Sequence, residues 1–530
     1  MQTLESILID GAWRPAVDPQ GSFRANDPAR AEPVGPHFPV SGPADVESAV
    51  QAAASAAPAL AAMPAARIAD FLDAYADAIA ADGDVLVALA HTETALPVEP
   101  RLRSGELPRT VDQLRQAARA VRDYAWTDPV IDTANNLRTH RAPLGKPVLV
   151  FGPNNFPFAF NAIAGSDFAS ALAARNPVIA KAHPLHPATS QRLATLAQRA
   201  AQSAGLPAAS VQMLYHFDST TGLKLAGDTR LGAIAFTGSR HGGLALKAAA
   251  DQAGVPFYAE LSSVNPVFLL PGALAQRGGE ALAQEFFASC TMGSGQFCTN
   301  PGVLIVPTDA EAGRGFLDAA TALFERSAPK ILFSRGGQDA VERAIATLRE
   351  AGAEVLAGGD PGEGEGFRHR PTLLGVDATD FLRHAEALQT EAFGPVSLIV
   401  RTAGVAEMAP VAAAFGGNLT GTLYRADDGR DDAAWRAIAA ELRPRVGRLI
   451  ANKMPTGVAV SPAMNHGGPY PATGHPGFTA VGMPASIHRF TALHCHDGVP
   501  DALLPIELRN RNPGGLQRLV DGRWTTADIG

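Results

Sequence analysis

Two side chains of this sequence, a thiol and a carboxylate, have the chemistry needed for covalent catalysis. Cys298 closes the loop Gly-Ser-Gly-Gln-Phe-Cys (293–298), which follows an apolar, helix-like run over 282–292. Glu260 ends the strand-like run Val-Pro-Phe-Tyr-Ala (255–259). A thiol can act as a nucleophile and a carboxylate as a general base. The alternative is an inert buried thiol, but the polar and glycine neighbours of Cys298 favour a reactive, accessible one.

Two loops that join a strand to a helix supply further candidates. Asn155, in Gly-Pro-Asn-Asn-Phe-Pro (152–157), could donate its side-chain N–H to a developing oxyanion, or could simply cap the helix. In Phe-Thr-Gly-Ser-Arg-His-Gly-Gly (236–243), Gly238 and Gly243 would let the backbone and a helix N-terminus approach a phosphate. This spacing differs from the Gly-x-Gly-x-x-Gly dinucleotide fingerprint, so a turn without a ligand is an equal alternative. Lys181 ends a strand and would face the same sheet edge, or would be a solvated lysine.

No histidine or cysteine pattern predicts a metal site. His183 and His186 are separated by Pro184 and Leu185 in a loop with no further ligand in view. In the strand-like triplet His494-Cys495-His496 the cysteine would point away from both histidines. Neither pattern forms a zinc-binding set. No motif supplies a histidine partner for Cys298 either, which disfavours a cysteine hydrolase.

The elements that must position these residues alternate between strands and helices. From residue 147 onward this order predicts a parallel α/β sheet with right-handed crossovers. Residues 44–125 are predicted to be mostly helical, 127–146 an extended ribbon and 486–493 a short strand. The expected strands are 147–151, 177–181, 211–215, 231–236, 256–261, 266–270 and 302–306, and the expected helices include 161–174, 188–204 and 275–292.

Length and composition limit the class of protein. A chain of 530 residues is too long for one core and should form two or three lobes. A net charge of −8 argues against a broad nucleic-acid surface, and we find no stretch that would span a membrane. The three cysteines are an odd number, which suits free thiols in a reducing compartment, and the N-terminus lacks the pattern of a signal peptide. We therefore expect a cytoplasmic protein.

Six motifs together resemble the aldehyde dehydrogenase superfamily over nearly the whole chain. Lys-Ala-His-Pro-Leu-His-Pro (181–187) and the loop over 467–473 are similar to the branch of α-ketoglutaric semialdehyde (2,5-dioxovalerate) dehydrogenases and an NADP-dependent fatty aldehyde dehydrogenase. The six motifs are Asn-Phe-Pro (155–157), Phe-Thr-Gly-Ser (236–239), Glu-Leu-Ser-Ser (260–263), Gly-Gln-Phe-Cys (295–298), Glu-Ala-Phe-Gly-Pro-Val (391–396) and Asn-Leu-Thr-Gly (418–421).

The resemblance implies a role for each candidate residue. Cys298 would be the nucleophile, Glu260 the general base, and Asn155 part of the oxyanion hole. For the cofactor, Lys181 would contact the adenosine ribose, Gly238 and Ser239 the pyrophosphate with Gly243 beside them, and Glu391 with Phe393 the nicotinamide half. Pro184 stands where NAD-preferring relatives often carry an acid, so we expect NADP to be preferred and NAD to be possible. The substrate tunnel would be lined by Phe156, Phe160, Ile163 and Phe297.

The resemblance also implies an architecture and an assembly. A Rossmann-like parallel-sheet cofactor domain would comprise 1–126 and 147–266, and an α/β catalytic domain 267–468. A small β bridging ribbon would comprise 127–146 and 469–500, joining subunits into a homodimer or homotetramer, with 501–530 as a C-terminal tail. The expected reaction oxidises α-ketoglutaric semialdehyde to 2-oxoglutarate. Medium-chain, long-chain or aromatic aldehydes are alternatives, as are a cysteine acyl-hydrolase without nicotinamide and a catalytically silent relative.

Overall fold

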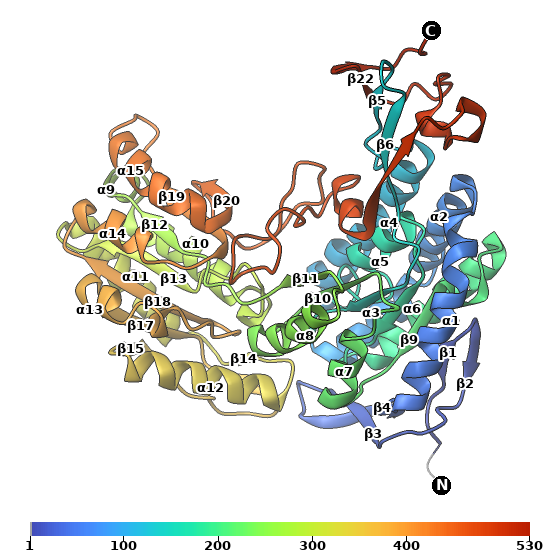
Figure 1. Ribbon diagram of the computed structural model, residues 1–530. Coiled ribbons are helices and arrows are strands. Elements are labelled where there is room, and N and C mark those ends of the chain that lie inside the picture. Colours follow the sequence, from blue (N-terminus) through green and yellow to red (C-terminus); the bar gives the residue numbers. More distant parts are fainter. Residues whose placement is uncertain (1–2) are drawn as a thin grey trace.

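The computed structural model describes residues 3–530, which form two α/β lobes and a third, mostly antiparallel sheet (Figure 1). The predicted α/β fold class is confirmed. Residues 1 and 2 of the expected first domain lie outside the described part. Within residues 3–530, no helix combines the length and the apolar character needed to cross a membrane.

The first lobe contains a seven-stranded sheet in the order β11-β10-β7-β8-β9-β1-β2. β7 to β11 run parallel, and helices cover them, so a strand such as β7 is buried at every position. The strands are β1 (Ile7–Ile9), β2 (Ala12–Arg14), β7 (Val148–Phe151), β8 (Val178–Lys181), β9 (Val211–Leu214), β10 (Ala233–Thr237) and β11 (Phe257–Glu260), with a separate β3 (Ser22–Asp27) and β4 (Glu32–Pro39) hairpin. The helices are α1 (Pro43–Ala61), α2 (Ala65–Ala81), α3 (Gly83–Thr94), α4 (Leu107–Arg122), α5 (Ser166–Ala173), α6 (Pro187–Ala204), α7 (Ser219–Ala226) and α8 (Arg240–Gln252).

The second lobe repeats this construction with the strand order β15-β17-β18-β13-β12-β19-β20. All its neighbouring strands are parallel except β15 and β17. The strands are β12 (Val267–Leu269), β13 (Val303–Pro307), β15 (Glu354–Ala357), β17 (Thr372–Asp377), β18 (Val396–Thr402), β19 (Asn418–Tyr424) and β20 (Val446–Ala451), with a small β14 (Lys330–Ile331) and β16 (Arg368–His369) pair. The helices are α9 (Pro271–Arg277), α10 (Gly279–Thr291), α11 (Glu311–Glu325), α12 (Arg335–Glu350), α13 (Ala378–Arg383), α14 (Met408–Ala413) and α15 (Asp432–Leu442).

The third sheet stands out from the first lobe and joins segments far apart in the sequence (Figure 1). Its order is β21-β6-β5-β22-β23, so the last 30 residues contribute two of its strands. The C-terminal segment is therefore part of a folded sheet rather than a free tail. Its strands are β5 (Val130–Asp132), β6 (Leu137–Pro143), β21 (Thr491–Asp497), β22 (Arg518–Val520) and β23 (Arg523–Thr525).

Three predicted elements differ from the structure for local reasons. The helix expected from 161 begins at Ser166, because the Asn161 amide bonds to nearby backbone groups and competes with the helix. The helix expected over 275–292 is two helices, separated at Gly278, whose φ of 84° only glycine adopts easily. The strand expected over 486–493 begins at Thr491, because residues 485–490 form helical turns that bury Ile487 and Phe490.

Candidate active site

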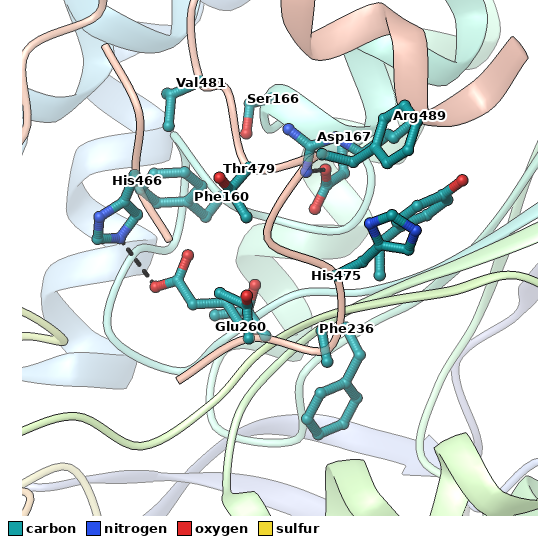
Figure 2. A pocket seen from close by; sticks show the side chains of 15 residues that line it. Phe160, Ser166, Asp167, Phe236, Glu260, His466, His475, Thr479, Val481 and Arg489 are labelled. Carbon is teal, nitrogen blue, oxygen red and sulfur yellow. Dashed lines mark hydrogen bonds and ion pairs between the residues drawn. The ribbon is translucent and has the colours of Figure 1, made fainter. Parts of the chain in front are cut away.

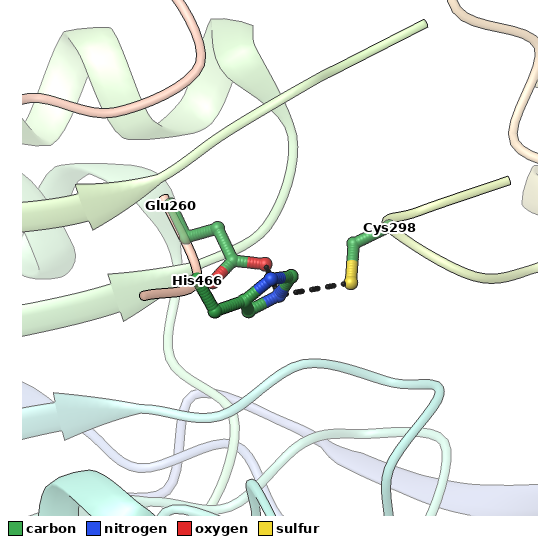
Figure 3. Close-up of side chains that lie close together, drawn as sticks. All are labelled: Glu260, Cys298 and His466. Atoms are coloured by element: carbon green, nitrogen blue, oxygen red, sulfur yellow. Dashed lines mark hydrogen bonds and ion pairs between the residues drawn. The ribbon is translucent and has the colours of Figure 1, made fainter. Parts of the chain in front are cut away.

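Cys298, His466 and Glu260 meet where the two lobes face each other (Figure 3). The Cys298 Sγ lies 3.2 Å from His466 Nε2. The same nitrogen lies 2.8 Å from Oε1 of Glu260. The sequence-based expectation that Cys298 has no histidine partner is therefore wrong. The expected pairing of Cys298 with Glu260 does occur in space, with the imidazole beside both groups.

The backbone before Cys298 is held in a conformation that aims its side chain at this junction. Gly293, Ser294 and Gly295 have successive φ angles of 54°, 58° and 71°. A Cβ on Gly295 would lie 2.2 Å from the carbonyl oxygen of Gly394, so glycine is required there by contact as well as by φ. The Asn265 amide donates to the carbonyl oxygen of Cys298 at 2.9 Å and fixes the end of the loop.

Glu260 and His466 are brought together by a chain segment that returns from the second lobe along β11. The N–H of Leu261 donates to the carbonyl of Ala472 at 2.8 Å, and the N–H of Gly474 donates to Ala259 at 3.1 Å. Figure 2 shows a small polar pocket on this side of Glu260, with His466 at one end and the Asp167–Arg489 ion pair, 2.9 Å long, at the other. Glu260 thus has a small polar cavity behind it, of a kind that can hold water.

The electrostatics of the site keep the thiol protonated. Burial raises the pKa of Cys298 well above its usual range, and the neighbouring Glu260 raises it further. Arg109 acts in the opposite direction on the Cys298 pKa, but its effect is the smallest. A neutral thiol is a poor nucleophile, so the thiol proton must be removed when the site reacts. His466 and Glu260 are the groups within reach to take it.

Asn155 lies beside the nucleophile loop. Its Nδ2 donates to the carbonyl of Gln296 at 3.0 Å, which leaves the second hydrogen of the amide for another acceptor. The loop carrying Asn155 is anchored by buried Glu106, which accepts the N–H groups of Phe158 and Ala159 at 2.8 and 2.9 Å. Arg101 pairs with Glu106 and donates to the carbonyl of Asn155 at 2.8 Å. The amide is therefore a fixed, uncharged donor.

A cavity of about 440 Å³ joins the catalytic groups to the start of helix α8. The helix is capped by Ser239, whose hydroxyl accepts the N–H of Gly242 at 3.3 Å. Of the predicted site residues, the cavity is lined by Asn155, Phe156, Phe160, Gly238, Ser239, Glu260, Cys298, Glu391 and Phe393. This shape suits a long ligand with a phosphate at the helix N-terminus and a reacting ring near Cys298. One cavity contains both the residues around Cys298 and those at the start of α8.

Four predicted site residues do not line this cavity. Ile163 is buried in the core of the first lobe, with its carbonyl accepting from Tyr75 at 3.1 Å, so its assignment to the substrate tunnel does not match its position. Gly243 faces inward, where a Cβ would lie 2.4 Å from Leu261. Phe297 packs behind Phe156, with ring centroids 5.5 Å apart. Lys181 is at the end of β8, beside His183, which does line the cavity.

Burial lowers the pKa of Lys181 to about 8. The positive charge of Lys181 lowers the pKa of three histidines, His183, His186 and His216. Burial is the one cause of the Lys181 shift, so no carboxylate of the described residues compensates its charge. This end of the first sheet is thus prepared for an anion.

The two histidine patterns that we did not expect to bind a metal can be compared with the structure. The rings of His183 and His186 stack at 5.3 Å, and His186 Nε2 lies 3.1 Å from the carbonyl oxygen of Pro153. Among residues 3–530, the group whose ligand atoms lie close enough to hold a metal ion is Glu260, Cys298 and His466. The expectation of no metal stays a prediction, because these three side chains also form the hydrogen-bonded cluster described above.

His466 is the main functional candidate that the sequence reading missed. It stands in Asn-His-Gly-Gly (465–468), directly before the Gly-Gly-Pro-Tyr-Pro loop that the resemblance had already marked. A histidine preceding two glycines in such a loop was the available signal. Its 168-residue separation from Cys298 concealed the contact.

Comparisons with known proteins show the family of this chain. A model described as the aldehyde dehydrogenase family matches residues 13–493. "Alpha-ketoglutaric semialdehyde dehydrogenase 2" of Azospirillum brasilense is 42% identical over 516 residues, covering 95% of this chain and 96% of that protein. "Alpha-ketoglutaric semialdehyde dehydrogenase" of Acinetobacter baylyi is 37% identical over 469 residues, covering 86% of this chain and 87% of that protein.

Solved structures show the same fold. A putative aldehyde dehydrogenase from Burkholderia cenocepacia superposes with a TM-score of 0.79 at 26% identity, covering 96% of this chain and all of that one. PnpE in complex with nicotinamide adenine dinucleotide gives a TM-score of 0.79 at 24% identity, covering 93% of this chain and 97% of that one. The chain belongs to the aldehyde dehydrogenase family, whose members oxidise an aldehyde to the carboxylic acid with a nicotinamide cofactor.

Proposed function

We propose that this enzyme oxidises α-ketoglutaric semialdehyde to 2-oxoglutarate, with NADP as its preferred cofactor. The observation that carries the reaction is the contact of Cys298 with His466 and Glu260 at one end of a cavity that reaches the N-terminus of α8. The substrate is supported by the relatives at 42% and 37% identity, which carry that substrate in their names.

In this mechanism Cys298 attacks the aldehyde carbon. The Glu260–His466 pair accepts the thiol proton, and the Nε2–H of His466 then lies against the new thiolate. Because the two groups share one short hydrogen bond, a proton received by one of them is held between both. Through this proton transfer, a thiol with a raised pKa becomes nucleophilic.

Asn155 stabilises the oxyanion that forms when the thiol adds. One amide hydrogen of Asn155 is bonded to the carbonyl of Gln296, and this bond fixes the direction of the second, free hydrogen. The amide therefore needs little reorientation as negative charge develops on the oxygen. The nicotinamide, when bound, supplies the hydride acceptor. The thiol proton first leaves the Glu260–His466 pair to solvent through the polar pocket behind it. Glu260 then activates a water that hydrolyses the Cys298 thioester, and the same pocket gives that water a route.

The cofactor preference follows from the charge around Lys181. A 2′-phosphate would compensate the charge of Lys181, which is half-buried and forms no ion pair with a carboxylate among residues 3–530. NAD lacks this phosphate but would keep the contacts to Gly238, Ser239, Glu391 and Phe393, so it is accepted more weakly. Since all four residues line the cavity, the roles implied by the resemblance fit it.

The third sheet supports the domain division and a homodimer or homotetramer. It projects from the first lobe and exposes large apolar side chains, with Leu493 67% and Trp524 63% exposed. Leu503, in the helical turn after β21, is 74% exposed. Apolar groups of this size on a projecting sheet suit contact with a second copy. We assign 3–126 with 147–266 to cofactor binding and 267–468 to catalysis. A cytoplasmic location stays a prediction.

A panel of aldehydes tests the proposal through NADPH and NADH formation. α-Ketoglutaric semialdehyde should give the highest kcat/KM, above glutarate semialdehyde, hexanal, decanal and benzaldehyde, and Cys298→Ala should abolish turnover. Preference for decanal or benzaldehyde would reject the substrate and support the alternative class. Thioester hydrolysis without any aldehyde oxidation would favour a cysteine acyl-hydrolase, and cofactor binding without turnover a silent relative.

A further inference from the structure

Three arginines lie near the catalytic groups, two of them, Arg101 and Arg109, against the rings of Phe156, Phe160 or Phe297, and the three differ in their bonding partners. Arg101 lies over the Phe156 ring at 4.4 Å, and its charge is paired with Glu106. Arg448 donates to the carbonyl groups of Pro455 and Gly457, both at 3.3 Å, and so holds a loop. These two guanidinium groups have structural partners.

Arg109, in the first turn of α4, has no such partner. Its Nε and Nη2 are buried, yet neither donates a hydrogen bond to any described residue. The group stacks on two rings, with its Cζ 4.9 Å from the Phe160 centroid and 5.7 Å from Phe156. A buried, unpaired guanidinium is costly, and buried polar atoms are nearly always bonded. The position therefore calls for an acceptor that the chain itself does not supply.

The position of Arg109 relates it to the reacting groups. Phe156 and Phe160 line the main cavity, and the Phe160 ring is 6.3 Å from that of His466, which contacts Cys298. Burial lowers the pKa of Arg109, and the nearby Glu106 acts most strongly against that shift. Cys298 and Glu260 act in the same direction as Glu106, so Arg109 lies within electrostatic reach of both groups. The rings of Phe156 and Phe160 thus lie between the Cys298–His466 contact and the unpaired guanidinium of Arg109.

We infer that Arg109 binds the distal carboxylate of a short aldehyde acid while its aldehyde group reacts at Cys298. The inference rests on the proposed function, whose substrate carries an aldehyde at one end and a carboxylate at the other. A guanidinium can bind a carboxylate through two parallel N–H groups, and the unpaired Nε and Nη2 offer that geometry. The phenylalanines would contact the methylene groups between. The chain thereby obtains the carboxylate receptor that its motifs did not reveal.

Glutarate semialdehyde and pentanal form the decisive pair, because they have the same five carbons and differ in the terminal carboxylate. Arg109→Met keeps an unbranched side chain against the rings but removes the charge. We expect it to lower the ratio of kcat/KM for glutarate semialdehyde to that for pentanal by roughly 10- to 100-fold, the range for a lost charged hydrogen bond. Arg109→Lys should lower the ratio less. Arg119→Met, at an exposed site of the same helix, should leave the ratio at the wild-type value.

Each outcome separates the inference from the proposed function. Equal losses for both aldehydes in Arg109→Met would show that Arg109 acts on folding or on the Cys298 thiol, and would overturn the inference. A wild-type preference for glutarate semialdehyde that survives Arg109→Met would also overturn it while the substrate class stands. A wild-type preference for pentanal would instead reject the proposed substrate. If Arg109→Met does not fold, Arg109→Lys and Arg109→Gln carry the same comparison.

Discussion

Replacing His466 by phenylalanine tests how the Cys298 thiol is activated. Phenylalanine has nearly the size of histidine, and the ring would keep its place beside Phe160 in a position that is almost fully buried. The substitution removes the Nε2 contacts to Cys298 and Glu260, at 3.2 and 2.8 Å. It therefore changes hydrogen bonding far more than packing.

The size of the effect follows from the bond that is lost. A hydrogen bond to a charged group contributes about 1.5–3 kcal/mol, which corresponds to an increase of roughly one to two units in the Cys298 pKa. Burial and Glu260 already raise that pKa, so the variant thiol should remain neutral to still higher pH. The rate of alkylation by iodoacetamide at pH 8 should fall by about 10- to 100-fold, because only the thiolate reacts.

Alkylation should be measured against pH in a Cys495→Ser background, because Cys495 is exposed and would react as well, whereas Cys290 is buried. Mass spectrometry of the peptide containing Cys298 gives the rate at that residue. An unchanged pH profile in His466→Phe would refute the role of His466 in activating the thiol. Glu260→Gln serves as the comparison, since it removes the carboxylate but leaves His466 beside the thiol.

Three other perturbations have defined outcomes. Because burial holds the pKa of Lys181 at about 8, the affinity for NADP should fall by up to about tenfold per pH unit above pH 8. Affinity for NAD should change far less, and parallel profiles in fluorescence titrations would contradict the proposed 2′-phosphate contact. Zn²⁺ should inhibit by binding the Glu260–Cys298–His466 group, with EDTA restoring activity, and a Co²⁺ thiolate absorption band that persists in Cys298→Ala would place the metal elsewhere. Burial raises the pKa of Glu93 from 4.5 to about 7, so the folded state retains a proton that the unfolded state has lost, and stability should decrease by up to about 3 kcal/mol as pH rises across that interval. Urea unfolding of Glu93→Gln should lack this decrease, and an identical pH dependence would show that another group causes it.

The alternation of strands and helices was enough to predict the α/β fold, because each buried parallel strand is a short apolar run between turns. The order of the motifs also placed Cys298, Glu260 and Asn155 in one family pattern. Predicted element bounds were wrong where a local interaction overrode the pattern, as at Asn161, whose side chain bonds to the backbone of Pro157 and Ile163. The burial of Ile487 and Phe490 similarly made helical turns where a strand was predicted.

His466 and Arg109 could not be predicted because their roles depend on distance in space. His466 reaches Cys298 only because the segment after it pairs with the end of β11. Arg109 is one of many arginines in the helical first quarter of the chain, and nothing in its neighbours marks it. What distinguishes it from Arg101 is the direct ion pair that Glu106 forms with Arg101, whereas Glu106 acts on Arg109 only through its charge. A missing partner is a property of the folded structure.

In the proposed mechanism, chemistry and substrate selection are therefore carried by different parts of this molecule. Cys298 comes from the second lobe, Glu260 and Asn155 from the first, and His466 from the segment that crosses between them, so the reacting geometry requires both lobes. Arg109 belongs to α4, whose other buried residues pack within the first lobe. A substitution there can alter which aldehyde is chosen without moving the nucleophile or its base. Specificity in this enzyme should accordingly change with the charge at position 109, while the Cys298–His466–Glu260 contacts set the rate of the chemical step.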